Sequence, residues 1–330
     1  MDYYPIPEQT VPEKPPIRRR MLWLAVPMLA IAFVFVCSAL LQVVLHALML
    51  KIYPSVTTAA WYPWVLSMLP MYGIAMPLSL LIYKLAPADA PVKREMDPWH
   101  WLLVLGLCFS LTYLGNFLGT FVNYLIGVIT GTPQTNEFAD AVTGMPLWVT
   151  VLFVGILAPI MEEIFYRKLV IDRIARFGDL PAILISGILF GLIHGNFSQF
   201  FYAAAIGTVL GYIYVKTGNI RYTVLLHMCV NFVGGVYSNE MLKRLDLEAL
   251  ETGSFVGIIR SFSGLNMYYA YLFFMAFTTI FGIVAFFLLR RRIHFYRPSQ
   301  STSAKEWAIL LLANPASYVL LAVIAFLFLV

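Results

Sequence analysis

Residues 147–169 read LWVTVLFVGILAPIMEEIFYRKL, an apolar run that carries two glutamates and an arginine near its end. A helix needs about 20 mostly apolar residues to cross the hydrocarbon core of a bilayer, and this run is long enough. Glu162 and Glu163 fall at its predicted inner end. Because ionisable side chains in a membrane are costly, they usually mark a functional site or an internal ion pair. The run therefore predicts a membrane-spanning helix that carries chemistry.

Similar apolar runs recur along the whole chain. Of its 330 residues, 61% are hydrophobic and 12% are charged, whereas soluble domains are about half apolar and about a quarter charged. Nine runs stand out, and the three between 181 and 238 are short. They are 21–48, 60–83, 101–129, 147–169, 181–197, 199–215, 221–238, 267–289 and 307–329. We predict an all-α fold, a polytopic transmembrane helical bundle with about eight or nine spans.

The ends and the longer loops complete this organisation. Residues 1–20 are polar and rich in proline, which predicts a disordered cytoplasmic tail before a single transmembrane domain at 21–330. The run at 21–48 is too long for the core of a signal peptide, so we interpret it as a retained span. Two outer loops, 130–146 and 239–266, are expected to cover the outer face, the second as an interfacial amphipathic helix.

The basic residues predict the orientation in a cell membrane. With the N-terminus in the cytoplasm, the nine-span topology places only four of the 22 Lys and Arg residues outside the cell. These four are Lys51, Lys243, Arg244 and Arg260. An excess of Lys and Arg on the inside is the usual rule. The net charge is +5, and the basic residues lie mainly at the ends of apolar runs. We therefore expect membrane lipids and no nucleic acid as partners.

The first polar cluster is the pair of adjacent glutamates. Glu163 and Arg167 are four residues apart, the favourable order for a helical ion pair. Glu162 points about 100° away and has no local partner. A carboxylate in a poorly solvated site is suited to proton transfer. The alternative is an interfacial charge cluster of the kind that ends many spans.

Two further polar clusters lie in later runs. His194 lies near the end of a glycine-rich run. From the sequence alone, a functional role and a role as a hydrogen-bonded packing residue are equally compatible with this position. His227 and Asn231 are four residues apart, which puts both on one helical face. Their alternative role is hydrogen bonding between helices.

Glycines at four-residue spacing predict that two of the short runs pack closely. Small residues at this spacing allow helix backbones to approach one another in lipid. One run has three such glycines and the next has two, namely Gly187, Gly191, Gly195, Gly207 and Gly211.

Together the polar residues can hydrolyse a peptide bond. Glu162 would take a proton from a water molecule that His194 holds, while His227 and Asn231 would donate to the oxyanion of the tetrahedral intermediate. The serines near His194 lack the G-x-S-x-G context of a nucleophile, and the chain has no H-E-x-x-H motif.

Three motifs carry a resemblance to a known family: Glu162-Glu163-x-x-x-Arg167, Phe190-x-x-x-His194 and His227-x-x-x-Asn231. In order, spacing and placement they resemble the motifs of the CPBP family, the CAAX proteases and bacteriocin-processing enzymes. The family includes type II CAAX prenyl endopeptidases and Abi-type proteins. The motif-bearing core covers about 145–238, and the chain is similar to the bacterial branch.

The resemblance implies an intramembrane endopeptidase whose site opens toward the cytoplasmic leaflet. Its substrate would be a peptide or a membrane-anchored protein, and CAAX specificity is not transferred. The implied catalytic residues are Glu162, His194, His227 and Asn231, supported by Glu163, Arg167 and Phe190.

The cofactor is left open between two possibilities. In the first, no cofactor takes part. In the second, His194, His227 and Glu162 hold Zn²⁺. We favour the metal-free reading because Asn231 would be a poor zinc ligand and a better oxyanion donor.

Two other classes of function stay open at this stage. Buried Glu and His residues can relay protons in a transporter, although the chain lacks the paired halves with broken helices that many transporters show. A non-catalytic immunity or partner protein could keep the same motifs, although the intact set argues against it.

Overall fold

The structure is a computed structural model that describes residues 14–59, 61–131, 145–245, 255–298 and 302–329. These residues form helices, turns and coil, with no strand among them. The predicted all-α fold is therefore confirmed. Most of the first outer loop (132–144) and a middle part of the second (246–254) lie outside the described residues, and so does the greater part of the predicted tail.

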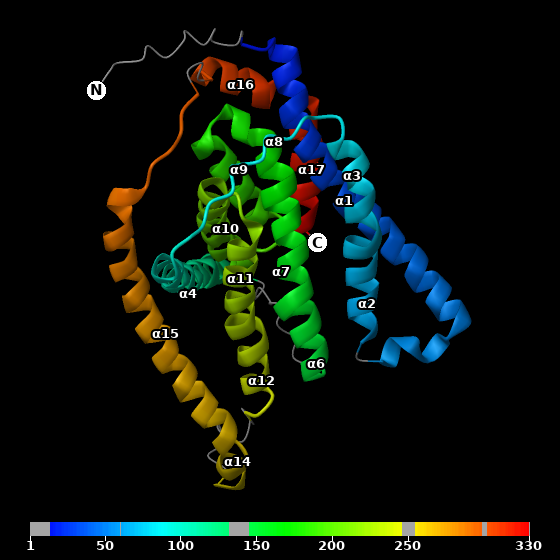
Figure 1. The fold of residues 1–330 in the computed structure, drawn as a ribbon. Coiled ribbons are helices and arrows are strands. Elements are labelled where there is room, and N and C mark those ends of the chain that lie inside the picture. Colours follow the sequence, from blue (N-terminus) through cyan, green and yellow to red (C-terminus); the bar gives the residue numbers. More distant parts are fainter. Residues whose placement is uncertain (1–13, 60, 132–144, 246–254, 299–301, 330) are drawn as a thin grey trace.

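In chain order (Figure 1) the helical elements are α1 (Ile17–Ile52), η1 (Pro54–Thr58), α2 (Tyr62–Met68), η2 (Leu69–Ala75), α3 (Met76–Tyr83), α4 (Pro98–Thr130), α6 (Leu147–Thr150), η3 (Val151–Leu157), α7 (Ala158–Glu163), η4 (Ile164–Ile171), α8 (Asp172–Ile174), η5 (Ala175–Phe177), α9 (Asp179–Leu192), α10 (Phe197–Thr217), α11 (Ile220–Asn231), η6 (Phe232–Tyr237), α12 (Ser238–Leu242), α14 (Phe255–Arg260), α15 (Phe262–Leu289), η7 (Arg290–Arg292), α16 (Ala304–Leu312) and α17 (Pro315–Leu329). Figure 1 shows α15 on one side and α1 on the other side of a central group formed by α7, α9, α10 and α11.

Six helices in the described chain are long and apolar enough to cross a membrane, or seven if the bent pair α16 and α17 is one span. The chain is thus a multi-pass membrane protein. The predicted number of eight or nine spans is not confirmed, because α9, for example, has only 14 residues. The first helix also begins earlier than predicted, at Ile17, so the arginines assigned to the tail belong to its first turns.

The helix that holds the two glutamates extends further than predicted. It runs without a break from Leu147 to Phe177, through α6, η3, α7, η4, α8 and η5. Glu162 and Glu163 therefore lie near its middle and not at its inner end, which corrects the prediction.

Charged residues beyond the predicted end do not stop this helix because they have partners. Asp172 accepts a hydrogen bond from the Tyr214 hydroxyl at 2.8 Å, and Arg173 donates to the Tyr83 carbonyl. Buried polar groups that are hydrogen-bonded cost far less free energy than unpaired ones. The helix ends at Gly178, whose φ of 110° suits glycine.

Four segments of the described chain are π-helical: η2, η3, η4 and η6. Such turns are rare and are frequent at functional sites. Pro70 lies within η2, and Pro159 lies two residues after the last residue of η3. Proline lacks an N–H and crowds the carbonyl four residues earlier, which favours a local widening of the helix. No proline accompanies the other two segments.

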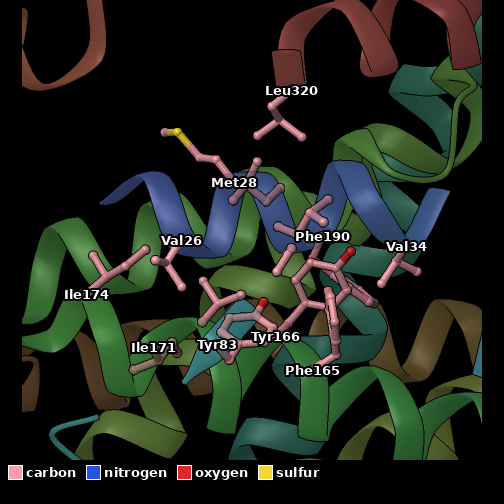
Figure 2. Packing of buried hydrophobic residues seen from close by; sticks show 14 of the residues in the cluster. Val26, Met28, Val34, Tyr83, Phe165, Tyr166, Ile171, Ile174, Phe190 and Leu320 are labelled. Atoms are coloured by element: carbon pink, nitrogen blue, oxygen red, sulfur yellow. The ribbon is translucent and has the colours of Figure 1, made fainter. Parts of the chain in front are cut away.

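The largest buried apolar cluster joins α1 to the helix of the two glutamates. Figure 2 shows Val26 and Val34 of α1 among the residues of this cluster, with Phe165 and Tyr166 of η4 nearby. Phe190 of α9 belongs to the same cluster and packs edge-to-face on Tyr166. This packing fixes the backbone on both sides of Glu162.

Helices α9 and α10 approach closely where glycines face the partner backbone. A Cβ atom on Gly187 would lie only 2.7 Å from the Thr208 nitrogen, and Gly207 lies directly opposite Gly187. The predicted packing of these glycines is confirmed. Gly195 is different, because it follows α9 with a φ of +66°, and its Cβ would lie 2.8 Å from the Leu327 carbonyl oxygen of α17.

Gly187→Ala is expected to lower the melting temperature in detergent, although alanine usually stabilises a helix relative to glycine. The new methyl group would push the α10 backbone away, and overpacking of this kind costs about 1–3 kcal/mol. Gly234→Ala is the matched control, since its Cβ would meet nothing within 4 Å. Thermal unfolding of both variants checks this, and equal melting temperatures would contradict the close approach.

Candidate active site

A cavity of about 1030 Å³ is lined by all four predicted catalytic residues, namely Glu162, His194, His227 and Asn231. They come from α7, from the loop after α9 and from α11. Most of the remaining wall is apolar and belongs to α1, α2, α4, α10 and α15 and to the π-helical segments. The structure thus brings together residues that the sequence places in three separate runs.

The two oxygens of Glu162 face different groups. Oε1 accepts a hydrogen bond from the Tyr72 hydroxyl at 2.8 Å. Oε2 lies 3.7 Å from Nε2 of His227. The side chain is 13% exposed, so it is shielded but open to the cavity. One oxygen is therefore held by the protein, and the other remains available for a water molecule.

Glu163 is fully buried in a network of partners. Both of its oxygens accept hydrogen bonds from Arg167, at 2.9 and 3.2 Å, which forms the predicted ion pair. Arg167 also donates to the Ser186 hydroxyl at 2.8 Å, and that hydroxyl donates to the Tyr166 carbonyl. A bidentate arginine–carboxylate pair fixes geometry as well as charge.

This network orients His227. Nδ1 of the imidazole lies 3.1 Å from Oε1 of Glu163. A carboxylate can only accept, so Nδ1 carries the proton in this contact. Nε2 is left facing Glu162 and the cavity. Glu163 therefore acts on the site through His227.

His194 is fixed by its own helix. Its Nδ1 donates to the Phe190 carbonyl at 2.8 Å, since a carbonyl can only accept. In the neutral imidazole this leaves the Nε2 lone pair free to accept a hydrogen bond from a water molecule. The following residue, Gly195, packs on α17 and positions the loop.

The ring of Phe190 packs against both imidazoles of the site. It packs edge-to-face on His194 with centroids 5.3 Å apart and on His227 with centroids 5.4 Å apart. The guanidinium of Arg167 lies 5.1 Å from its centroid. Phe190, predicted as a supporting residue, therefore contacts three members of the site.

Asn231 donates one amide hydrogen bond, to the Val154 carbonyl of η3 at 3.0 Å. This bond sets the direction of the amide, and the second N–H of the same nitrogen remains available in the cavity. Its neighbour along the helical face, His227, lies one turn earlier. The two side chains thus line the same wall, as their spacing predicts.

The serines considered from the sequence serve other contacts. Ser186 is bonded to Arg167 and to a carbonyl, and Ser198 accepts a hydrogen bond from Asn123 at 2.6 Å. Neither residue lines the cavity. The geometry gives no support to a serine nucleophile.

The residues proposed as zinc ligands do not form a three-ligand set. No three His, Cys, Asp or Glu side chains of the described ranges are grouped so as to hold a metal ion. The side chains present therefore do not fit a structural or catalytic zinc site in this arrangement, and we derive no step through a metal.

Sequence reasoning did not identify several polar residues that line the cavity, among them Gln199, Tyr202 and Tyr72. Gln199 and Tyr202 lie on α10, and Tyr72 lies on η2. A glutamine in an apolar run is a signal that could have pointed to the first. Tyr72 gives no local signal, because its partner is 90 residues away in the chain.

Comparisons with known proteins agree with the motifs. Residues 144–233 match the family model described as type II CAAX prenyl endopeptidase Rce1-like. This segment contains all four catalytic candidates and the three residues predicted to support them. No solved structure matches the chain.

Three bacterial relatives are similar to the chain. YdiL of Bacillus subtilis (strain 168), a candidate membrane peptidase by its name, is 26% identical over 155 residues, which cover 46% of this chain and 63% of YdiL. The UPF0177 protein YxdF of Lactococcus lactis subsp. lactis (strain IL1403) is 26% identical over 162 residues, or 47% of this chain and 89% of YxdF. The membrane-embedded CAAX protease MroQ of Staphylococcus aureus (strain USA300) is 23% identical over 148 residues, or 42% of this chain and 57% of MroQ.

These alignments cover less than two thirds of YdiL and of MroQ. The predicted resemblance is nevertheless confirmed over the part of the chain that holds the site, where the sequence matches the Rce1-like type II CAAX prenyl endopeptidases.

Proposed function

We propose that this chain is an intramembrane endopeptidase that hydrolyses a peptide bond with a water molecule activated by Glu162. One observation carries the proposal: Oε2 of Glu162 faces a cavity that it shares with His194, His227 and Asn231. The similarity to a family of membrane proteases supports the same reaction.

The reaction would begin with a water molecule between Glu162 and His194. Nε2 of His194 accepts a hydrogen bond from the water, and Oε2 of Glu162 takes the other proton as the water oxygen attacks the carbonyl carbon of the substrate. Asn231, and His227 in its doubly protonated form, donate N–H bonds to the oxyanion that develops. The glutamic acid then passes its proton to the leaving nitrogen as the C–N bond breaks, which yields a free amine and a carboxylic acid that then loses its proton to water.

The proposed substrate is a peptide or a membrane-anchored protein, cut at the cytoplasmic side of a cell membrane. The apolar wall of the cavity suits an unfolded segment with apolar side chains. The proposal does not include a prenylated substrate, although the names of the family and of MroQ refer to CAAX substrates.

The decisive experiment is peptide cleavage by purified full-length protein in liposomes. Wild type is compared with His227→Ala, each with and without a strong chelator. We expect wild-type cleavage to persist under the chelator and to fall about 100-fold or more in the variant, the size of a lost oxyanion donor.

Three outcomes would change the proposal. Loss of cleavage under the chelator with recovery on adding Zn²⁺ would favour the zinc alternative. Proton-coupled flux without any proteolysis would favour a transporter. Equal cleavage by wild type and His227→Ala would remove His227 from the reaction.

A further inference from the structure

One hydrogen bond to the proposed site comes from outside the matched segment. Tyr72 belongs to η2, whereas the family match covers only 144–233. Its side chain is almost buried, with 7% exposed. Its hydroxyl donates to Oε1 of Glu162 at 2.8 Å.

From this contact we infer that Tyr72 is a positioning residue that holds the Glu162 carboxylate in its reactive orientation. The inference rests on the proposed function of the site. A phenol keeps its proton at neutral pH and can donate it to a carboxylate. With Oε1 held by Tyr72, rotation of the carboxylate is restricted, and Oε2 is the oxygen that faces His227 and the cavity.

The backbone around Tyr72 fits such a role. Tyr72 lies in the middle of a π-helical turn that contains Pro70. A π-helical turn changes the direction in which the side chains around it point, and such turns are frequent at functional sites. The Tyr72 residue also belongs to the same buried cluster as Tyr166 and Phe190, which fixes its ring. Its hydroxyl thus reaches Glu162 from a rigid support.

A second buried tyrosine provides a matched control. Tyr83 lies in the same apolar cluster and is 1% exposed. Its ring packs edge-to-face on Phe165, but its hydroxyl has no hydrogen-bond partner among the described residues. Removing the hydroxyl from Tyr83 therefore tests the loss of a buried phenol oxygen without any effect on Glu162.

The experiment measures kcat, KM and melting temperature for full-length wild type, Tyr72→Phe and Tyr83→Phe with one peptide substrate in liposomes. Tyr72→Phe is expected to lower kcat about 10- to 100-fold, the usual effect of losing a hydrogen bond to a charged group. KM should stay near the wild-type value, because the ring remains in place, and the melting temperature should fall only by the cost of one hydrogen bond. Tyr83→Phe should match wild type in all three.

The outcomes separate this inference from the proposed function. If wild type cleaves and Tyr72→Phe keeps its kcat, Tyr72 does not position Glu162, although the endopeptidase proposal stands. A Tyr72→Phe variant with a changed KM or a lower melting temperature but an unchanged kcat would also overturn the inference, since it would show that Tyr72 has a packing role only. If wild type itself does not cleave, the proposed function fails, and the inference fails with it.

Discussion

Glu162→Gln is expected to lower kcat by about 10²- to 10⁴-fold, the usual contribution of a positioned general base. The amide has nearly the same shape as the carboxylate and can still accept from Tyr72. It cannot take a proton from water at neutral pH, so the step that creates the nucleophile is lost. Peptide cleavage by the purified variant, in single-turnover and steady-state assays, measures the effect.

A remote carboxylate controls for the change from acid to amide. Glu306 lies on α16, away from the cavity, and pairs with Lys14 and Arg20. Glu306→Gln is expected to cleave at the wild-type rate. If Glu162→Gln keeps a similar rate, a group other than Glu162 activates the water, and the mechanism proposed above is wrong.

Arg167→Met is expected to destabilise the protein by about 3–5 kcal/mol, the cost of breaking a buried ion pair from one side. Glu163 and Arg167 are both fully buried, so the variant leaves a charged carboxylate without its main partner. The double variant Glu163→Gln with Arg167→Met should recover much of the stability that Arg167→Met loses, because no unpaired buried charge remains. Unfolding in detergent monitored by circular dichroism measures these differences.

The chain offers an exposed pair with the same spacing for comparison. Glu240 and Arg244 are also four residues apart and 3.0 Å from each other, but the arginine is 49% exposed. Arg244→Met is expected to cost less than about 1 kcal/mol, as exposed ion pairs usually do. If Arg167→Met and Arg244→Met lower the free energy of unfolding by the same amount, burial does not govern the strength of the Glu163–Arg167 pair.

The sequence predicted the parts of the site that depend on helical spacing. Four-residue offsets correctly paired Glu163 with Arg167 and put His227 and Asn231 on one wall, because an α-helix repeats every 3.6 residues. The apolar runs likewise predicted the positions of most helices. Local periodicity is enough for both, since hydrophobic burial and helical geometry act over a few turns.

Contacts between distant helices could not be predicted in the same way. The bond from Tyr72 to Glu162 depends on how two helices are placed side by side, and no pattern within either run encodes that. The true end of the fourth predicted span was also missed. Asp172, which lies beyond the predicted end at residue 169, is hydrogen-bonded to Tyr214 of a helix that follows later in the chain.

The ring of Phe190 has a consequence for how the two imidazoles of the site are placed. It packs edge-to-face on both His194 and His227, and it neither titrates nor donates. An apolar side chain thus contacts both imidazoles of the proposed site, and a change of volume at position 190 is expected to shift the two rings without altering any polar group.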